Sequence, residues 1–203
     1  MLKFALICLF LFINFAYSKG KTPAIINGTV ITDKDEARFF VGITTKKDKG
    51  FFVCGGTLFA RNKVLTAAHC FEDFNINNPE RVFIKYGTKN PLDNTEEIQA
   101  SKIVVHPKYD FHQIEPKKNK GDLAVITLSE PIEEGANVKY AELQTEESKI
   151  GDKFTVYGWG RTKVRKDPKV PEPDEKPPRL LKANLTLVEI KDKELVLKDP
   201  IQS

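Results

Sequence analysis

Short runs of β-favouring residues, separated by turn and loop residues, recur along the chain after residue 38. They lie at 39–44, 51–54, 63–66, 81–86, 98–105, 123–128, 153–157 and 183–188. Several alternate apolar and polar side chains, as in Asn184-Leu185-Thr186-Leu187, which is typical of a sheet with one solvated face. The sequence contains no convincing long amphipathic helical pattern. Many short strands with frequent turns therefore predict an all-β fold, either a barrel or a sandwich.

Two segments between these runs carry turn or loop signals. Residues 46–50, Lys-Lys-Asp-Lys-Gly, separate the first two β runs and predict a hairpin with a longer loop. Residues 164–179 contain prolines at 168, 171, 173, 177 and 178 among lysine, glutamate and aspartate. Proline removes backbone donors and the charges resist burial, so we expect a mobile surface loop there.

The N-terminus has the pattern of a secretory signal peptide. Lys3 is followed by an unbroken apolar run over residues 4–13, and Ala16-Tyr17-Ser18 provides small residues for cleavage. The run is too short to span a bilayer, and no later stretch reaches the required length of about 18 apolar residues. We therefore expect residues 1–18 to be removed, and the mature protein to be secreted, extracellular and not anchored in a membrane.

The cysteines and the charge of the chain indicate which covalent bonds and which partners to expect. Loss of the signal peptide removes Cys8 and leaves Cys54 and Cys70, which in an oxidising compartment predict one disulfide rather than two free thiols. Charge is nearly balanced, with 32 Lys and Arg against 28 Asp and Glu and a net charge of +4. The short basic runs lack stacking aromatic residues, so we expect solvated loops and no nucleic-acid partner.

Two residues suit acid–base chemistry. His69 follows a predicted strand and stands beside a cysteine, so its imidazole could be held rigidly and act as a base near neutral pH. Asp122 precedes an apolar strand, where its carboxylate could accept a hydrogen bond from an imidazole N–H. The spacing alone leaves open an ordinary surface histidine and a turn aspartate.

Six motifs across residues 25–160 remove that ambiguity. They are Ile25-Ile26-Asn27-Gly28, Cys54-Gly55-Gly56-Thr57-Leu58, Thr66-Ala67-Ala68-His69-Cys70, His106-Pro107-Lys108-Tyr109, the segment 121–128 (Gly-Asp-Leu-Ala-Val-Ile-Thr-Leu) and Gly158-Trp159-Gly160. In this order they resemble the landmarks of trypsin/chymotrypsin-like serine endopeptidases. The resemblance implies two antiparallel Greek-key β-barrels over residues 25–203, with a short propeptide at 19–24.

The resemblance also implies roles for individual residues. His69 would be the general base and Asp122 the group that orients it, with Cys54 and Cys70 paired beside the histidine. Ile25 would be the N-terminus that activation of the zymogen exposes, although Ala24 before it does not suit a trypsin-like activator. The substrates would be proteins or peptides, the protein would be a monomer, and no metal or cofactor is implied.

The chain departs from the family at its nucleophile. No Gly-Asp-Ser-Gly-Gly segment occurs within the 203 residues, and the second barrel is expected to be incomplete. The serines that could substitute lack glycine neighbours and a strained turn that would expose a hydroxyl to His69; they are Ser101, Ser129, Ser148 and Ser203. We therefore expect this chain, as written, not to hydrolyse peptides.

Three interpretations remain open. The chain could be part of a secreted serine endopeptidase whose sequence is truncated here. It could be a catalytically dead homologue that acts as a binding or regulatory protein through its first barrel, or a secreted fragment without function. The intact histidine and aspartate motifs favour the first, because dead homologues often alter these residues as well.

Two positions fit the N-glycosylation pattern. They are Asn27, in Asn27-Gly28-Thr29, and Asn184, in Asn184-Leu185-Thr186. Asn27 lies close to the expected activation point, which argues against a glycan there. Asn184 lies in a predicted strand, where a glycan fits only if that face of the strand is exposed.

Overall fold

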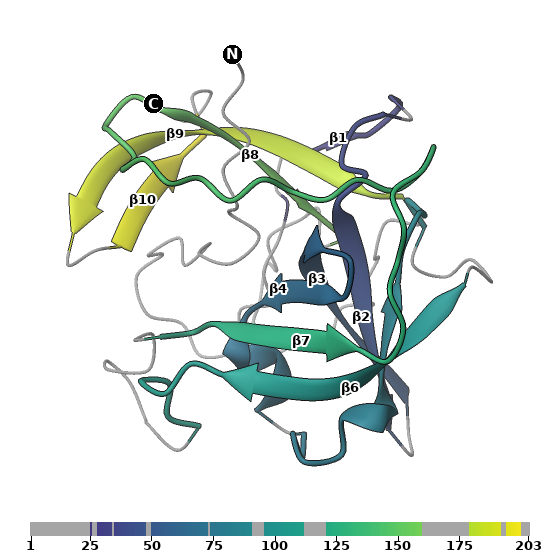
Figure 1. Ribbon diagram of the computed structural model, residues 1–203. Coiled ribbons are helices and arrows are strands. Elements are labelled where there is room, and N and C mark those ends of the chain that lie inside the picture. Colours follow the sequence, from purple (N-terminus) through teal and green to yellow (C-terminus); the bar gives the residue numbers. More distant parts are fainter. Residues whose placement is uncertain are drawn as a thin grey trace, which may run out of the picture. The chain divides into compact units, whose positions relative to one another are not determined.

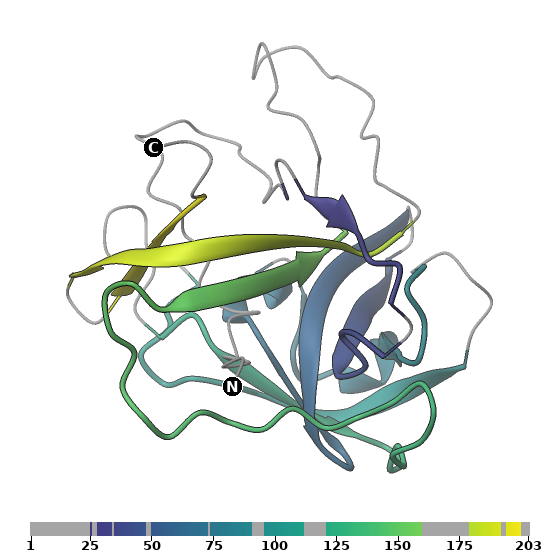
Figure 2. The same ribbon diagram turned by 90° about the horizontal axis from the view of Figure 1, so that it is seen from above.

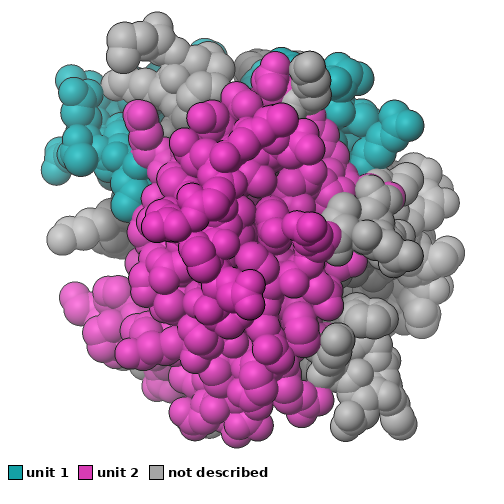
Figure 3. All heavy atoms as spheres, turned by 45° about the vertical axis from the view of Figure 1, so that its right-hand side comes forward, with its two compact units in different colours: residues 1–33, 143–203 teal, residues 34–142 magenta. Residues whose placement is uncertain are grey.

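The computed structural model describes residues 25, 28–33, 35–47, 50–72, 74–90, 96–111, 121–159, 179–191 and 194–199. These residues belong to two compact units, which Figure 3 shows in different colours. Unit 1 comprises residues 1–33 and 143–203, and unit 2 comprises residues 34–142. The expected signal peptide and propeptide, Asn27 and nearly all of the proline-rich segment lie outside the described residues.

Unit 2 is a closed barrel of six antiparallel strands (Figure 1). Around the barrel the strands follow the order β2, β3, β4, β7, β6 and β5, and β5 pairs with β2 to close it. Their bounds are β2 Phe40–Lys47, β3 Gly50–Ala60, β4 Lys63–Thr66, β5 Val82–Lys85, β6 Glu97–Val105 and β7 Ala124–Leu128. Among the described residues, 3-10 helices lie between β4 and β5, η1 at Ala68–Phe71 and η2 at Pro79–Arg81.

The apolar interior of the barrel is formed by every second side chain of its strands. Burial alternates strictly along β4, β5 and β7, because successive side chains of a strand point to opposite faces. The inward positions carry branched aliphatic side chains that are fully buried, namely Leu58, Val64, Val82, Ile84 and Ile126. Their burial is the main source of stability of this unit.

The pairing of β4 with β7 brings distant parts of the sequence together. These strands run antiparallel, with Val64 opposite Ile126 and Thr66 opposite Ala124. The C-terminal end of β4 therefore lies beside the N-terminal end of β7. The residues just after β4 and just before β7 share one end of the barrel as a result.

Unit 1 is a second antiparallel sheet, which does not close into a barrel within its described strands. The long strand β9 (Leu181–Lys191) pairs with β8 (Lys153–Gly158), with the short β1 (Thr29–Val30) and with β10 (Glu194–Lys198). Figures 1 and 2 show β8 and β9 side by side. One face of the sheet holds an apolar core of Ile25, Phe154, Val156, Leu181, Leu185, Leu187 and Leu197.

The predicted all-β class is confirmed, and each predicted strand corresponds to a strand of the structure. The prediction of a five-residue hairpin loop at 46–50 was wrong, since Lys46, Lys47 and Gly50 take part in the β2–β3 ladder. Ladder bonds join backbone groups, so a strand can continue through charged residues. Strands β1 and β10 were not predicted.

Within the described residues, no helix combines the length and apolar character that crossing a membrane requires.

Candidate active site

His69 lies in the short helix η1, directly after strand β4. Ala67, which joins β4 to η1, and Ala68, the first residue of η1, are both small and buried. A larger side chain at either position would overpack this buried connection. The imidazole of His69 stays partly accessible, with 39% of its side chain exposed.

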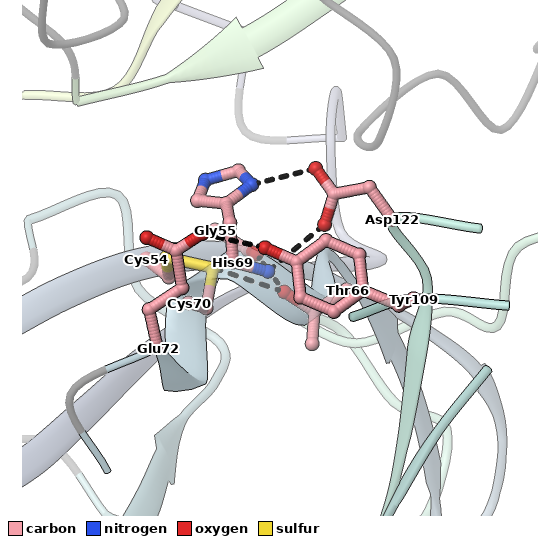
Figure 4. Close-up of polar contacts among 8 residues, drawn as sticks. All are labelled: Cys54, Gly55, Thr66, His69, Cys70, Glu72, Tyr109 and Asp122. Carbon is pink, nitrogen blue, oxygen red and sulfur yellow. Dashed lines mark hydrogen bonds and ion pairs between the residues drawn. A yellow bond between two sulfur atoms is a disulfide. The ribbon is translucent and has the colours of Figure 1, made fainter. Parts of the chain in front are cut away.

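A disulfide fixes η1 to strand β3, and a hydroxyl fixes the end of β4 to the same strand. Cys70 of η1 is bonded to Cys54 of β3. The hydroxyl of Thr66, at the end of β4, donates to the carbonyl oxygen of Gly55 at 2.9 Å and lies 3.7 Å from the Cys70 sulfur. Figure 4 shows these groups next to the backbone of His69. The histidine is therefore held by the residues on either side of it.

Asp122 lies two residues before β7, in a tight turn. Gly121 has a positive φ of 73°, and the N–H of Leu123 donates to the Gly121 carbonyl at 2.6 Å. A Cβ on Gly121 would lie 2.5 Å from Nδ1 of His106. This position combines a left-handed backbone with a close neighbour, so a glycine fits it best.

The structure brings His69 and Asp122 into direct contact (Figure 4). Nδ1 of the imidazole lies 2.8 Å from Oδ2 of Asp122, and the backbone N–H of His69 donates to Oδ1 at 2.9 Å. Asp122 is almost fully buried, with 1% of its side chain exposed. A buried carboxylate is costly unless it is paired, and both of its oxygens are used here by the same histidine.

This geometry assigns different roles to the two ring nitrogens. A carboxylate only accepts hydrogen bonds, so Nδ1 carries the proton that faces Asp122. In the neutral imidazole, Nε2 is then the nitrogen that can accept a proton. When it does, the carboxylate stabilises the resulting imidazolium. The pair can therefore act as an oriented general base.

A second carboxylate contact lies next to this pair. The hydroxyl of Tyr109, a residue that is 8% exposed, donates to Oε1 of Glu72 at 2.6 Å. Burial, followed by this hydrogen bond and the charges of Glu72 and Asp122, raises the pKa of Tyr109 well above its usual value. The phenol therefore keeps its proton and remains a donor across the neutral range.

One group of side chains among the described residues has the spacing of metal ligands, Cys54, His69 and Cys70. The two sulfurs are bonded to each other, so neither is a thiolate that could bind a metal. Cysteines bonded in this way do not suit a metal centre.

None of the described serines of unit 2 is placed to serve His69. Ser101 donates to the carbonyl oxygens of Thr127 and Leu128, at the opposite end of β7 from Asp122. Ser129 follows the same end of that strand. Of the other two serines considered, Ser148 belongs to unit 1 and Ser203 lies outside the described residues.

The candidate residues from the sequence fall into two groups. His69, Asp122, Cys54 and Cys70 come together at one end of the barrel in unit 2. Ile25 lies in unit 1, where 8% of it is exposed. The hydrogen bond from Tyr109 to the carboxylate of residue 72 was not anticipated. Its only sequence signal was the tyrosine that closes the His106–Tyr109 motif.

A family comparison agrees with this arrangement. The family model described as Trypsin matches residues 25–188. That range includes all of unit 2 and part of unit 1, with the disulfide and the His69–Asp122 pair, so the match does not rest on one short motif.

Curated proteins and a solved structure show similar sequences or folds. The venom peptide isomerase heavy chain of Agelenopsis aperta is 33% identical over 129 residues, covering 61% of this chain and 50% of that protein. Trypsin-2 of Salmo salar is 31% identical over 118 residues, covering 57% and 46%. The chain thus spans about half the length of these relatives. A structure titled "Structure of GrC" has a TM-score of 0.63 at 26% identity, covering 81% of this chain and 66% of that one.

Proposed function

The chain belongs to the trypsin family, and we propose that it is the part of a secreted serine endopeptidase that carries the general base. It would act as a monomer on peptide bonds in proteins or peptides. One observation carries the proposal: the buried carboxylate of Asp122 accepts both the ring and the backbone N–H of His69. An ordinary surface histidine has no need for a buried partner that fixes its tautomer.

The chemistry would be acyl transfer to water. His69 Nε2 would take the proton of a serine hydroxyl as that oxygen attacks the peptide carbonyl. The nitrogen would then give the proton to the leaving amine. Asp122 would keep the imidazole in the required tautomer throughout, without becoming protonated itself. The serine and the oxyanion donors would have to come from sequence outside residues 1–203.

We propose the following organisation of the chain. Residues 1–18 are a signal peptide, residues 19–24 a short propeptide, and residues 25–203 a trypsin-like domain without its C-terminal part. Ile25 would become the N-terminus on activation of the zymogen. The Ile25 side chain packs in the apolar core of unit 1. Cleavage before Ile25 would therefore require local opening of that core.

The purified 203-residue chain is expected to show no peptidase activity, because it has a base but no nucleophile. Hydrolysis of a mixture of chromogenic peptide amides should be the same for the chain and for His69→Ala. Circular dichroism of both proteins controls for folding. Hydrolysis by the chain that disappears in His69→Ala would contradict this expectation.

Secretion would allow glycosylation at Asn184. The structure places this side chain on the exposed face of β9, where Oδ1 accepts a hydrogen bond from the Thr155 hydroxyl at 2.9 Å. Expression with the native leader in a eukaryotic secretory host should yield a protein that begins at Lys19 and loses glycan mass on treatment with an N-glycosidase.

Two threonine variants provide the control. Thr186→Val destroys the glycosylation signal and should abolish the glycan. Thr155→Val removes only the hydrogen-bond partner of Asn184 and should keep the glycan. Equal masses of the enzyme-treated and untreated secreted protein would refute glycosylation at this site.

A further inference from the structure

Tyr109 is connected to the segment that carries Asp122 by backbone hydrogen bonds. The N–H of Tyr109 donates to the carbonyl of His106 at 2.9 Å. The N–H of His106 in turn donates to the carbonyl of Leu123 at 2.8 Å. Leu123 directly follows Asp122, so the position of the tyrosine is coupled to that of the aspartate.

The same tyrosine is connected to the segment that carries His69. Its hydroxyl donates to Oε1 of Glu72 at 2.6 Å. Glu72 ends the helix η1, and its backbone N–H donates to the carbonyl of His69 at 3.2 Å. Figure 4 shows Tyr109 and Glu72 beside the His69–Asp122 pair.

The bond between Tyr109 and Glu72 has the properties of a structural connection. The tyrosine is 8% exposed, and its ring packs edge-on against Phe111 at a centroid distance of 5.2 Å. Packing of the ring therefore sets the direction in which the Tyr109 hydroxyl points. A hydroxyl that donates to a carboxylate makes one of the stronger hydrogen bonds in proteins. Glu72 itself is exposed, so packing does not fix the direction of its side chain as it does for the tyrosine.

We propose that Tyr109 and Glu72 are positioning residues, and that their hydrogen bond holds η1 at the distance from β7 that the contact between His69 and Asp122 requires. Neither residue would touch a substrate. The disulfide fixes η1 to β3, on one side of β4, whereas this bond fixes it to the connection that follows β6. That this positioning serves catalysis rests on the proposed function. That the bond holds η1 relative to β7 does not.

The test is hydrogen exchange at His69, measured by NMR on the purified secreted chain. The probes are the backbone N–H, which donates to Asp122 Oδ1, and the Nδ1–H. Tyr109→Phe removes the hydroxyl and keeps the ring. We expect both His69 protons to exchange roughly tenfold faster or more in this variant. The amides of Val64 and Ile126, in the middle of β4 and β7, should be unaffected.

Variants of Glu72, and a control at a similar tyrosine–glutamate bond elsewhere in unit 2, make the test more specific. Glu72→Ala should repeat the effect of Tyr109→Phe, and the double variant should be no worse than either. Glu72→Gln should keep most of the protection, because its amide oxygen can accept the same bond. The control is Tyr86→Phe, which removes a similar bond to Glu96 (2.9 Å) in the same unit and should leave His69 unchanged.

Two results would overturn the proposal. In one, exchange at His69 is unchanged in both Tyr109→Phe and Glu72→Ala. In the other, all barrel amides accelerate together, which would mean a general loss of stability. If Tyr109→Phe does not fold, Glu72→Ala decides, since it alters an exposed side chain. The measurement needs no peptidase activity, so its failure leaves the hydrolysis result for the proposed function unaffected.

Discussion

Gly121→Ala is expected to lower the free energy of unfolding of unit 2 by about 2–5 kcal/mol. Left-handed backbone costs an alanine about 1–2 kcal/mol. The new methyl group would also lie 2.5 Å from His106 Nδ1 and 3.1 Å from the Lys108 Cβ, and such overpacking costs about 1–3 kcal/mol. Because the next residue is Asp122, the displacement should also weaken its contact with His69. Urea unfolding followed by circular dichroism measures the loss.

Gly87→Ala is the matched control. Gly87 lies in the same unit with a nearly equal φ of 66°, but a Cβ there would make only ordinary contacts, at 3.6 Å or more. It should therefore cost only the backbone strain, about 1–2 kcal/mol. Equal losses for the two variants would show that the close approach to His106 has no energetic effect.

Removal of the Cys54–Cys70 disulfide should destabilise unit 2 by about 3 kcal/mol. The bridge joins residues 16 apart, and the chain-entropy model gives about this value for a loop of that length. The midpoint of thermal unfolding should fall by roughly 10 °C in the Cys54→Ala/Cys70→Ala variant. Differential scanning calorimetry measures the shift.

A dithiol reductant provides the control for this variant. It should lower the midpoint of the native chain to that of the variant, and should leave the variant unchanged. A native midpoint that does not respond to complete reduction would contradict a stabilising role. In that case Thr66, through its bond to Gly55, would be sufficient to hold η1 on the barrel.

Much of the fold could be predicted because its signals are local. Alternation of apolar and polar residues located strands such as β4 and β7 to within a residue or two, since a barrel needs one buried face per strand. Strand β10 was not predicted because no sequence signal indicated that it pairs with β9. Its Leu197 is buried only through packing against the core of unit 1. That is a tertiary effect.

The site was predictable to the extent that its residues stand in motifs. His69 and Asp122 lie in such motifs, and the β4–β7 ladder explains how two residues 53 positions apart in the sequence come into contact. The bond between Tyr109 and Glu72 joins positions 37 residues apart, and Glu72 stands in no motif. The close approach of Gly121 to His106 likewise depends on the turn geometry, which the sequence pattern does not contain.

If His69 and Asp122 form the base of a serine endopeptidase, we propose that its nucleophile is encoded beyond the codon for Ser203. Reading the transcript through that codon is the most direct test. We predict that the full message continues in frame into a segment of the Gly-Asp-Ser-Gly-Gly type. A stop codon immediately after Ser203 in every message would contradict the enzyme function, and a binding role for the barrel of unit 2 would have to be tested in its place.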